Sequence, residues 1–183
     1  MALANPHQTK VAVSEITAVS NTTFLVDELD GEPQPKGNKK IYLADISAAT
    51  DVGPRAKVSG TTYQADARGL LINGAPIETF VGVSGVSGVD EATGKLSAAG
   101  IKVAGKKLKL DLTDLLRSLS ANGNFFGDAK IEGVVTPDGA KTLFVANDSD
   151  FGLSGVASNT PPFSLKPKIL PNGAQDSGEI LKG

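Results

Sequence analysis

The stretch SEITAVSNTTFLVDELD, residues 14–30, has the same layout as IEGVVTPDGAKTLFVANDSD, residues 131–150, and this repeat is the strongest indication of the fold. Each stretch has a glutamate, Glu15 or Glu132, at the start of an apolar strand. Each then turns and continues as a second apolar strand that ends among carboxylates. This layout predicts two copies of an acidic β-hairpin.

A hairpin brings the start of its first strand beside the end of its second strand. Glu15 is therefore expected near Glu28, and Glu132 near Asn147 and Asp148. Repeated β-units that stack on one another present equivalent residues on one face. The repeat thus predicts an acidic face to which both hairpins contribute.

The composition favours one mostly-β domain over residues 1–183. Glycine occurs 21 times, proline 10 times and tryptophan never, which is typical of many short strands joined by turns. The absence of cysteine excludes disulfides, thiolate zinc sites and cysteine nucleophiles. A formal net charge of −2 gives no electrostatic reason to expect nucleic acid or an anionic membrane as a partner. No stretch has the roughly 18 apolar residues of a membrane span.

Several segments outside the repeat have recognisable patterns. Residues 39–46, 69–72 and 79–83 are predicted to be strands, and the glycine- and serine-rich residues 82–100 a flexible surface excursion. Short clusters of lysine are predicted to be solvated ends of strands. They are Lys39-Lys40, Lys106-Lys107 and Lys109.

A helix is predicted near residues 112–121. Its apolar residues follow i, i+3, i+4, i+7 spacing and are expected to face the core; they are Leu112, Leu115, Leu116 and Leu119. Asp111 is the expected N-cap, and Gly123 belongs to the expected stop signal.

The ends of the chain carry weaker signals. The first residues lack the basic segment and apolar core of a signal peptide, and residues 1–9 are expected to form a flexible N-terminus. The proline-bearing residues 161–183 are expected to run over the surface in extended form.

Four phrases in the chain resemble, in order, the later part of the phytase-like family, "esterase-like activity of phytase". They are VSEITAVSNTTFLVDELDG (13–31), KKIYLADISAATDV (39–52), KKLKLDLTDLL (106–116) and AKIEGVVTPDGAKTLFVANDSDFG (129–152). The chain departs from the family pattern at Leu29, where the family has arginine, and at Ser149, where it has asparagine. By the resemblance, the first departure removes the arginine expected to contact phosphate at that point, and the second removes one candidate oxygen ligand.

The resemblance implies a partial β-propeller-like stack of antiparallel blades, because the family domain is longer than this chain. An open stack would expose sheet edges and invite self-association. The resemblance further implies that calcium and a phosphate ester bind where acids gather at strand ends. The implied metal ligands are Glu15, Glu28, Glu132, Asn147 and Asp148. Oxygen ligands of this kind suit calcium, which accepts six to eight of them.

The acidic residues also have a structural interpretation, in which they cap turns and keep strand ends hydrated. That interpretation is favoured for Asp30, Asp138 and Asp150, whereas Glu15 and Glu132 fit either interpretation, because a lone carboxylate inside an apolar strand is costly.

The sole histidine, His7, lies too near the N-terminus to be expected as a fixed general base. Any esterase activity is then expected to depend on a metal ion or on carboxylates, or to be supplied by residues outside this chain. The catalytic residues themselves are not identified by the sequence.

Two functions remain open at this point. One is calcium-dependent binding or hydrolysis of a small phosphate ester. The other is a catalytically inactive propeller fragment that binds a partner in the extracellular space or the cell envelope. The family resemblance implies a secreted, periplasmic or envelope location for either of them.

Overall fold

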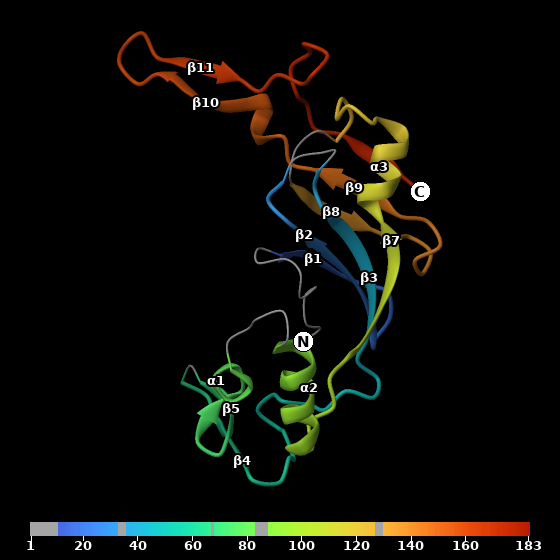
Figure 1. The fold of residues 1–183 in the computed structure, drawn as a ribbon, viewed down its shortest axis with the longest axis vertical. Coiled ribbons are helices and arrows are strands. Elements are labelled where there is room, and N and C mark those ends of the chain that lie inside the picture. The colour runs from blue at the N-terminus through green and yellow to red at the C-terminus, as the bar shows by residue number, and fades with distance from the viewer. Residues whose placement is uncertain (1–10, 33–35, 67, 83–87, 127–129) are drawn as a thin grey trace. The chain divides into compact units, whose positions relative to one another are not determined.

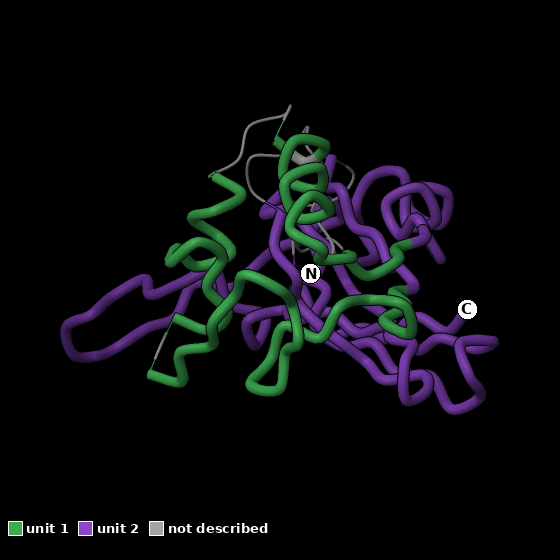
Figure 2. Tube along the Cα trace, turned by 90° about the horizontal axis from the view of Figure 1, so that it is seen from below, with its two compact units in different colours: residues 1–9, 44–106 green, residues 10–43, 107–183 purple. Residues whose placement is uncertain are grey.

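The structure, a computed structural model, describes residues 11–32, 36–66, 68–82, 88–126 and 130–183. It is mostly β, with antiparallel strand pairs and a few short helices (Figure 1), as the sequence predicts. Contacts along the chain define two compact units (Figure 2). Among the described residues, unit 1 holds 44–106, and unit 2 holds 11–43 and 107–183. The expectation of a single domain stays a prediction, and the N-terminal residues 1–9 lie outside the described part.

The two larger β-sheets of unit 2 have the strand orders β1-β2-β3-β7 and β12-β9-β8. Their strands are β1 (Ala12–Ala18), β2 (Thr23–Leu29), β3 (Lys39–Asp45), β7 (Gly105–Asp111), β8 (Ile131–Val135), β9 (Phe144–Asn147) and β12 (Ile180–Lys182). The predicted strand over 39–46 is thus confirmed. A propeller-like stacking of these sheets stays a prediction.

The two predicted hairpins, β1–β2 and β8–β9, form with corresponding registers. Thr17 pairs with Leu25 in the first hairpin, and Val134 pairs with Val145 in the second. Leu25 and Val145 are both buried in the same core. The hairpins are joined directly, because the Thr17 hydroxyl donates to the Val134 carbonyl at 2.5 Å. The sequence repeat is therefore also a structural repeat.

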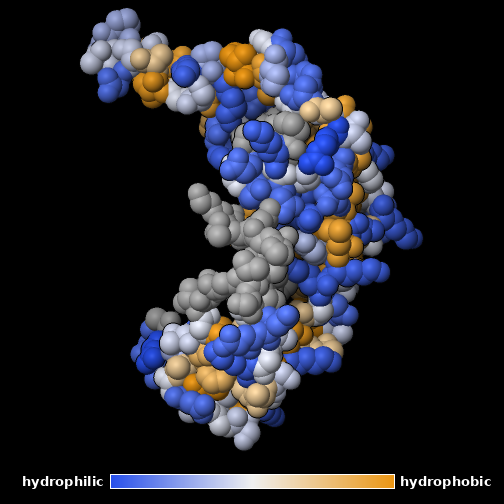
Figure 3. Space-filling model, viewed as in Figure 1, coloured by the Kyte–Doolittle hydropathy of each residue, from blue (hydrophilic) through white to orange (hydrophobic). Residues whose placement is uncertain are grey.

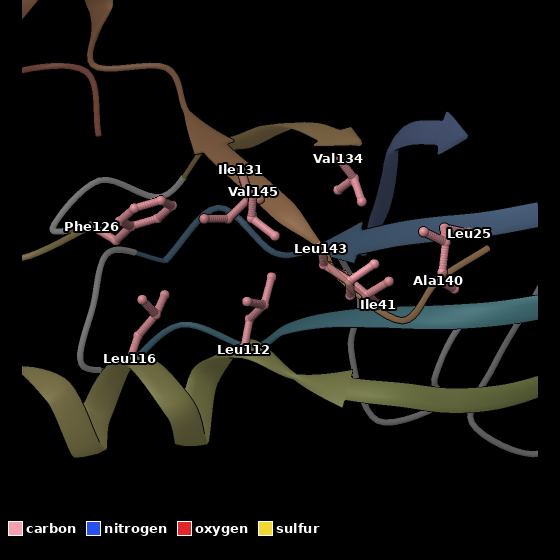
Figure 4. Packing of buried hydrophobic residues seen from close by; sticks show 10 residues of the cluster. All are labelled: Leu25, Ile41, Leu112, Leu116, Phe126, Ile131, Val134, Ala140, Leu143 and Val145. Carbon is pink, nitrogen blue, oxygen red and sulfur yellow. The ribbon is translucent and has the colours of Figure 1, made fainter. Parts of the chain in front are cut away.

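The core of unit 2 gathers residues from both sheets and from helix α3 (Leu112–Leu119) (Figure 4). Its buried members are Leu25, Ile41, Leu112, Leu116, Phe126, Ile131, Val134, Ala140, Leu143 and Val145. Burial of each such side chain stabilises the fold by about 1.5–3 kcal/mol before entropy losses are subtracted. This core fixes the positions of both acidic hairpins.

Helix α3 confirms the helix predicted near 112–121. Asp111 is its N-cap, and the Asp111 carboxylate accepts a hydrogen bond from the Asp114 backbone N–H at 3.1 Å. Leu112 and Leu116 are buried, as expected. The expectation for Leu119 is wrong, because this side chain is 56% exposed in the last turn of the helix.

Unit 1 has a separate, smaller core. It contains β4 (Thr61–Gln64), β5 (Gly69–Ile72), β6 (Ala75–Pro76), α1 (Ile77–Val81) and α2 (Gly88–Ala98). β5 pairs with both β4 and β6, which confirms the strand predicted over 69–72. The buried residues of this core are Leu70, Ile72, Leu96 and Ile101.

The strand predicted over 79–83 is wrong for its described residues, because residues 79–81 belong to α1. Pro76 is the N-cap of the helix, with φ −54° and ψ 151°. Proline has no N–H to donate to a strand ladder, which favours the end of β6 at this residue. Ile77, Phe80 and Val81 then pack on the unit 1 core with helical spacing.

The flexible excursion expected over 82–100 is also wrong from residue 88 onward, where α2 forms; residues 83–87 lie outside the described part. Ala92 and Leu96 are buried one turn apart on this helix. Gly100 ends it with φ +75°, a conformation that glycine adopts without strain. Glycine and serine lower helix propensity, and burial of the apolar face outweighs that loss.

The C-terminal part of unit 2 contains a second kind of hairpin. A short 3₁₀ turn, η1 (Asp150–Gly152), leads into β10 (Leu153–Ser158), which pairs with β11 (Ser164–Pro167) as a separate two-stranded sheet. Within the expected extended segment 161–183, β11 and β12 are the strands. None of the helices that the structure describes is long and apolar enough to cross a lipid bilayer.

Candidate functional site

The first acidic hairpin brings Glu15 opposite Asp27. A bulge lies between Val13 and Glu15 on β1, so that Val13 pairs with Glu28 and Glu15 pairs with Asp27. Residues directly opposite each other in an antiparallel pair project from the same face of the sheet. Glu15 therefore shares a face with Asp27, whereas Glu28, the next residue on β2, projects from the other face.

Asp27 is a buried carboxylate whose pKa departs far from its ordinary value. Its residue surface is 1% exposed. Among the described residues, neither of its carboxylate oxygens has a hydrogen-bond partner. Burial raises the pKa of Asp27 to about 7; the nearby Lys39 opposes this rise, and Glu15 and Glu28 add to it. A buried carboxylate without partners is costly, and binding a proton or a cation lowers that cost.

Lys39 carries the positive charge that lowers the pKa of Asp27, and its side chain is fully buried. Its ammonium donates to the Asp30 carboxylate at 3.2 Å and to the Glu32 carbonyl at 2.7 Å. Its backbone N–H donates to the Thr113 hydroxyl at 2.7 Å, which ties β3 to α3. The prediction that Lys39 is a solvated strand end is therefore wrong. Its charge is buried because the fold supplies oxygen partners for it.

Glu28 is also buried, at 4% exposure, and it influences Tyr42 on the neighbouring strand β3. Burial raises the pKa of the Tyr42 hydroxyl, and the negative charges of Glu28 and Asp111 raise it further. The two faces of β2 thus carry separate acidic environments, one at Asp27 and one at Glu28.

The second hairpin differs from the first at its glutamate. Glu132 is exposed and lies in a bulge between Ile131 and Gly133, where it has no residue opposite it. Asn147 pairs with Ile131. The Asn147 side-chain oxygen accepts the Glu179 backbone N–H at 2.7 Å, and its amide nitrogen is buried and without a partner among the described residues. Asn147 occupies the position in β9 that Asp27 occupies in β2.

Asp148 and Asp150 belong to an ion-pair network with two lysines. Lys130 approaches Asp148 at 3.3 Å and Asp150 at 2.5 Å, and Lys168 approaches Asp150 at 3.0 Å. Hydrogen bonds from Lys130 and Lys168 lower the pKa of Asp150. The same network raises the pKa of Lys130, chiefly through Asp150. These carboxylates are therefore already neutralised by side chains of the protein.

The acids for which a structural role was favoured have such roles. The Asp138 carboxylate accepts the Thr142 backbone N–H at 2.7 Å inside the turn of the second hairpin. That hydrogen bond is the main cause that lowers the pKa of Asp138. Asp30 accepts the Asn38 backbone N–H at 3.0 Å and pairs with Lys39. His7 lies outside the described residues.

The structure places the five predicted metal ligands in different surroundings. Glu15 and Glu28 flank Asp27 in the first hairpin, Glu132 is an exposed bulge residue, and Asn147 and Asp148 are hydrogen-bonded near the end of β9. No three His, Cys, Asp or Glu side chains of the described chain are grouped as they would be around a metal ion. The shared five-residue site stays a prediction.

Sequence reasoning missed Asp27 and Lys39. Asp27 follows three apolar residues, Phe24-Leu25-Val26, and alternates with Leu25, so its position on the core face was readable from the strand period. The register that sets Glu15 against Asp27 was not readable, because the bulge on β1 shifts it by one residue.

Antiparallel sheets around a common core, with carboxylates on paired strands, define a mostly-β protein with an acidic hairpin. The chain matches the family model described as phytase-like, esterase-like activity of phytase, over residues 2–151. No curated protein and no solved structure matches it. The family match covers most of the chain, so the protein belongs to the phytase-like family. The match ends just before β10.

Proposed function

We propose that the protein binds small phosphate esters with the help of calcium and hydrolyses them. Membership of the phytase-like family supports this proposal. The single observation that carries it is the Glu15–Asp27 pair, in which a buried carboxylate without hydrogen-bond partners among the described residues lies opposite a second carboxylate. Two carboxylates held on one face attract a cation.

The residues of the first hairpin fit calcium better than the full set of five. Glu15 and Asp27 offer carboxylate oxygens on one face, which is the ligand type that calcium prefers. Asn147 and Asp148 are engaged by Glu179, Lys130 and the backbone, so a contribution from them requires rearrangement. Bound calcium would neutralise phosphate charge and activate water.

In this proposal the carboxyl group of Asp27 binds a proton when calcium is absent. With its pKa raised to about 7 by burial, its carboxyl holds a proton in a large fraction of molecules near neutral pH. A cation and this proton compete for the same oxygens, so calcium binding should release a proton. Lys39 opposes cation binding, because its positive charge already stabilises the ionised carboxylate.

Thermal melting with calcium and with chelator tests the cation site. We expect calcium to raise the melting temperature of the parent protein, since a ligand at a hundredfold excess over its dissociation constant stabilises the fold by about 2.7 kcal/mol. Asp27→Asn and Glu15→Gln should each abolish that shift. Asp66→Asn, which alters an exposed carboxylate in unit 1, should leave it unchanged. A calcium shift that survives both hairpin variants would reject this site.

Hydrolysis is tested separately, with phytate and a generic phosphomonoester as substrates. We expect turnover with calcium, none with chelator, and none for Asp27→Asn in either condition. The same Asp66→Asn variant is the matched control and should retain full activity. Turnover that is insensitive to chelator would reject the role of calcium.

The second candidate is a catalytically inactive binding module of the extracellular space or the cell envelope. The observation that favours it is that Asp148 and Asp150 are paired with Lys130 and Lys168. Absence of turnover in every condition, with or without a calcium shift, would favour this module. Fractionation of producing cells would test the proposed location outside the cytoplasm.

Self-association through open sheet edges belongs to the same proposal. Strands β7 and β12 each form an outer edge of their sheet in the described chain. Unpaired edge strands readily pair with another chain. Sedimentation at increasing protein concentration should show growth of the assembly; a monomer at every concentration would contradict it.

A further inference from the structure

The hairpin β10–β11 extends from the rest of unit 2 with both faces in solvent (Figure 1). All four residues of β11 are exposed, and β10 is exposed along its centre. Figure 3 shows hydrophobic groups on this projecting hairpin. A two-stranded hairpin alone is only marginally stable in water. Apolar side chains that are grouped and exposed on such a hairpin are typical of a surface that contacts another molecule or a membrane.

Val156 and Leu165 share one face of the hairpin. They pair directly across the two strands, and Phe163 lies two residues before Leu165, just outside β11. Their exposed fractions are 63% for Val156, 59% for Leu165 and 73% for Phe163. Lys166 alternates with Leu165 and leaves from the opposite face. The hairpin is therefore amphipathic although neither face is covered.

The charge of this segment is opposite to that of the whole chain. From Phe151 to Gln175 the sequence contains no Asp or Glu, although the chain has 20 of them and a formal net charge of −2. The segment carries Lys166 and Lys168; Lys168 pairs with Asp150 at the base of the hairpin, and Lys166 is exposed on β11. The expectation that anionic membranes are not partners rested on the net charge of −2 and on interspersed charge signs along the chain, and residues 151–175 depart from both.

A second copy of the chain fits this surface poorly. Three side chains of this size offer roughly 500 Å² of contact area, compared with about 800 Å² per partner in a stable interface. Addition of a strand to the hairpin edge is also disfavoured. The β10–β11 ladder has register shifts between Leu153 and Gly155 and between Val156 and Ser158, and such bulges disturb edge pairing.

We propose that the β10–β11 hairpin docks on a lipid bilayer that contains anionic lipids. Phe163, Leu165 and Val156 enter the boundary between headgroups and acyl chains, where binding strength grows with the apolar area buried and with attraction to anionic lipids. The long stem of Lys166 lets its ammonium reach anionic headgroups from the opposite face. The absence of carboxylates in the segment removes the repulsion that the rest of the chain would bring. This inference is independent of the calcium site.

Flotation with lipid vesicles tests the proposal on the full chain. We expect the protein to bind vesicles of phosphatidylcholine mixed with phosphatidylglycerol, and to bind pure phosphatidylcholine vesicles more weakly. Added salt should weaken binding to the mixed vesicles, because the lysine contribution is screened. No binding to the mixed vesicles would overturn the proposal.

Leu165→Ser and Leu119→Ser form a matched pair of variants. The two leucines have similar exposed fractions, 59% and 56%, but Leu119 is on helix α3. We expect Leu165→Ser, like Phe163→Ser, to weaken vesicle binding about tenfold or more, and Leu119→Ser to have no effect. Equal losses for the two leucine variants would indicate non-specific adhesion and overturn the proposal.

The lack of cysteine in the chain permits a direct measurement of insertion. A polarity-sensitive dye on Phe163→Cys should shift to shorter emission wavelength with mixed vesicles, and the same dye on Leu119→Cys should not. Unchanged melting of the variants would show that the exposed substitutions leave the fold intact. A dye shift that depends on protein concentration without vesicles would identify a second copy as the occupant and reject the bilayer.

Discussion

Among single residues, Asp27 stands out because it is an ionisable side chain that follows two buried apolar residues of β2. Leu25 and Val26 are apolar and buried, whereas Asp27 is equally buried and ionisable. Burial raises its pKa from the ordinary value of 3.8 to about 7. The folded protein therefore holds a proton on Asp27 in a pH range where the unfolded chain has released it.

Asp27 should make the free energy of unfolding fall as the pH rises. Its stabilising contribution is complete below about pH 4, declines through the range from 4 to 7, and is lost above about pH 7, when the buried carboxylate is ionised. The change is on the order of a few kcal/mol. We expect Asp27→Asn to remove this slope, measured by denaturant unfolding at several pH values without calcium.

The variants are compared by the slope of the free energy of unfolding against pH. The buried amide of Asp27→Asn changes the free energy of unfolding by an amount that does not depend on pH, so it does not affect this slope. Asp66→Asn, at an exposed position, should keep the slope of the parent protein. Parallel profiles for the parent and Asp27→Asn would contradict the buried carboxyl as its source.

At the scale of elements, helix α2 shows how burial can outweigh local preference. Its glycines and serines led to the prediction of a flexible excursion, yet Ala92 and Leu96 bury one face of a helix. The Leu96 carbonyl accepts the Ile101 backbone N–H at 2.9 Å, and Ile101 packs in the same core, so Gly100 closes the helix in a Schellman arrangement.

Two glycines of this region should respond to alanine in opposite directions. A Cβ at Gly94, inside α2, meets no atom within 4 Å, so Gly94→Ala should stabilise the protein by up to about 1 kcal/mol. Gly100 has φ +75°, so Gly100→Ala should destabilise it by about 1 kcal/mol or more. Thermal melting of the two variants gives the signs. Destabilisation by Gly94→Ala would argue against a helix at this position.

At the scale of the whole molecule, each compact unit has its own hydrophobic core. Leu96 belongs to the core of unit 1 and Leu116 to that of unit 2. We expect Leu96→Ala to speed amide hydrogen exchange mainly within residues 44–106, and Leu116→Ala mainly within residues 11–43 and 107–183. Truncation of a buried leucine costs about 2–5 kcal/mol.

Peptide-level hydrogen exchange with mass spectrometry resolves these two regions. Leu119→Ala is the control, because this leucine is exposed on the same helix as Leu116 and should change exchange little. Equal acceleration throughout the chain by both core variants would show that the two cores open together.

The first hairpin shows how far the sequence alone reaches. The paired strands, the turn and the presence of acids at one end all follow from a period of two and from turn residues, which are local properties. The pairing of Glu15 with Asp27 depends on a bulge, and the burial of Lys39 depends on oxygens from Asp30 and Glu32. These features involve contacts whose geometry the local pattern does not encode.

Local sequence patterns are enough to predict the repeated acidic hairpins, the helix that begins after Asp111 and the mostly-β class, because periodicity, capping and turn chemistry act over a few residues. The different surroundings of the five expected ligands, the helix α2 and the exposure of β10–β11 emerge only from the folded arrangement. Burial, register and ion pairing depend on which distant segments meet, and the cost of burying Asp27 exists only after β1, β2 and β3 have come together.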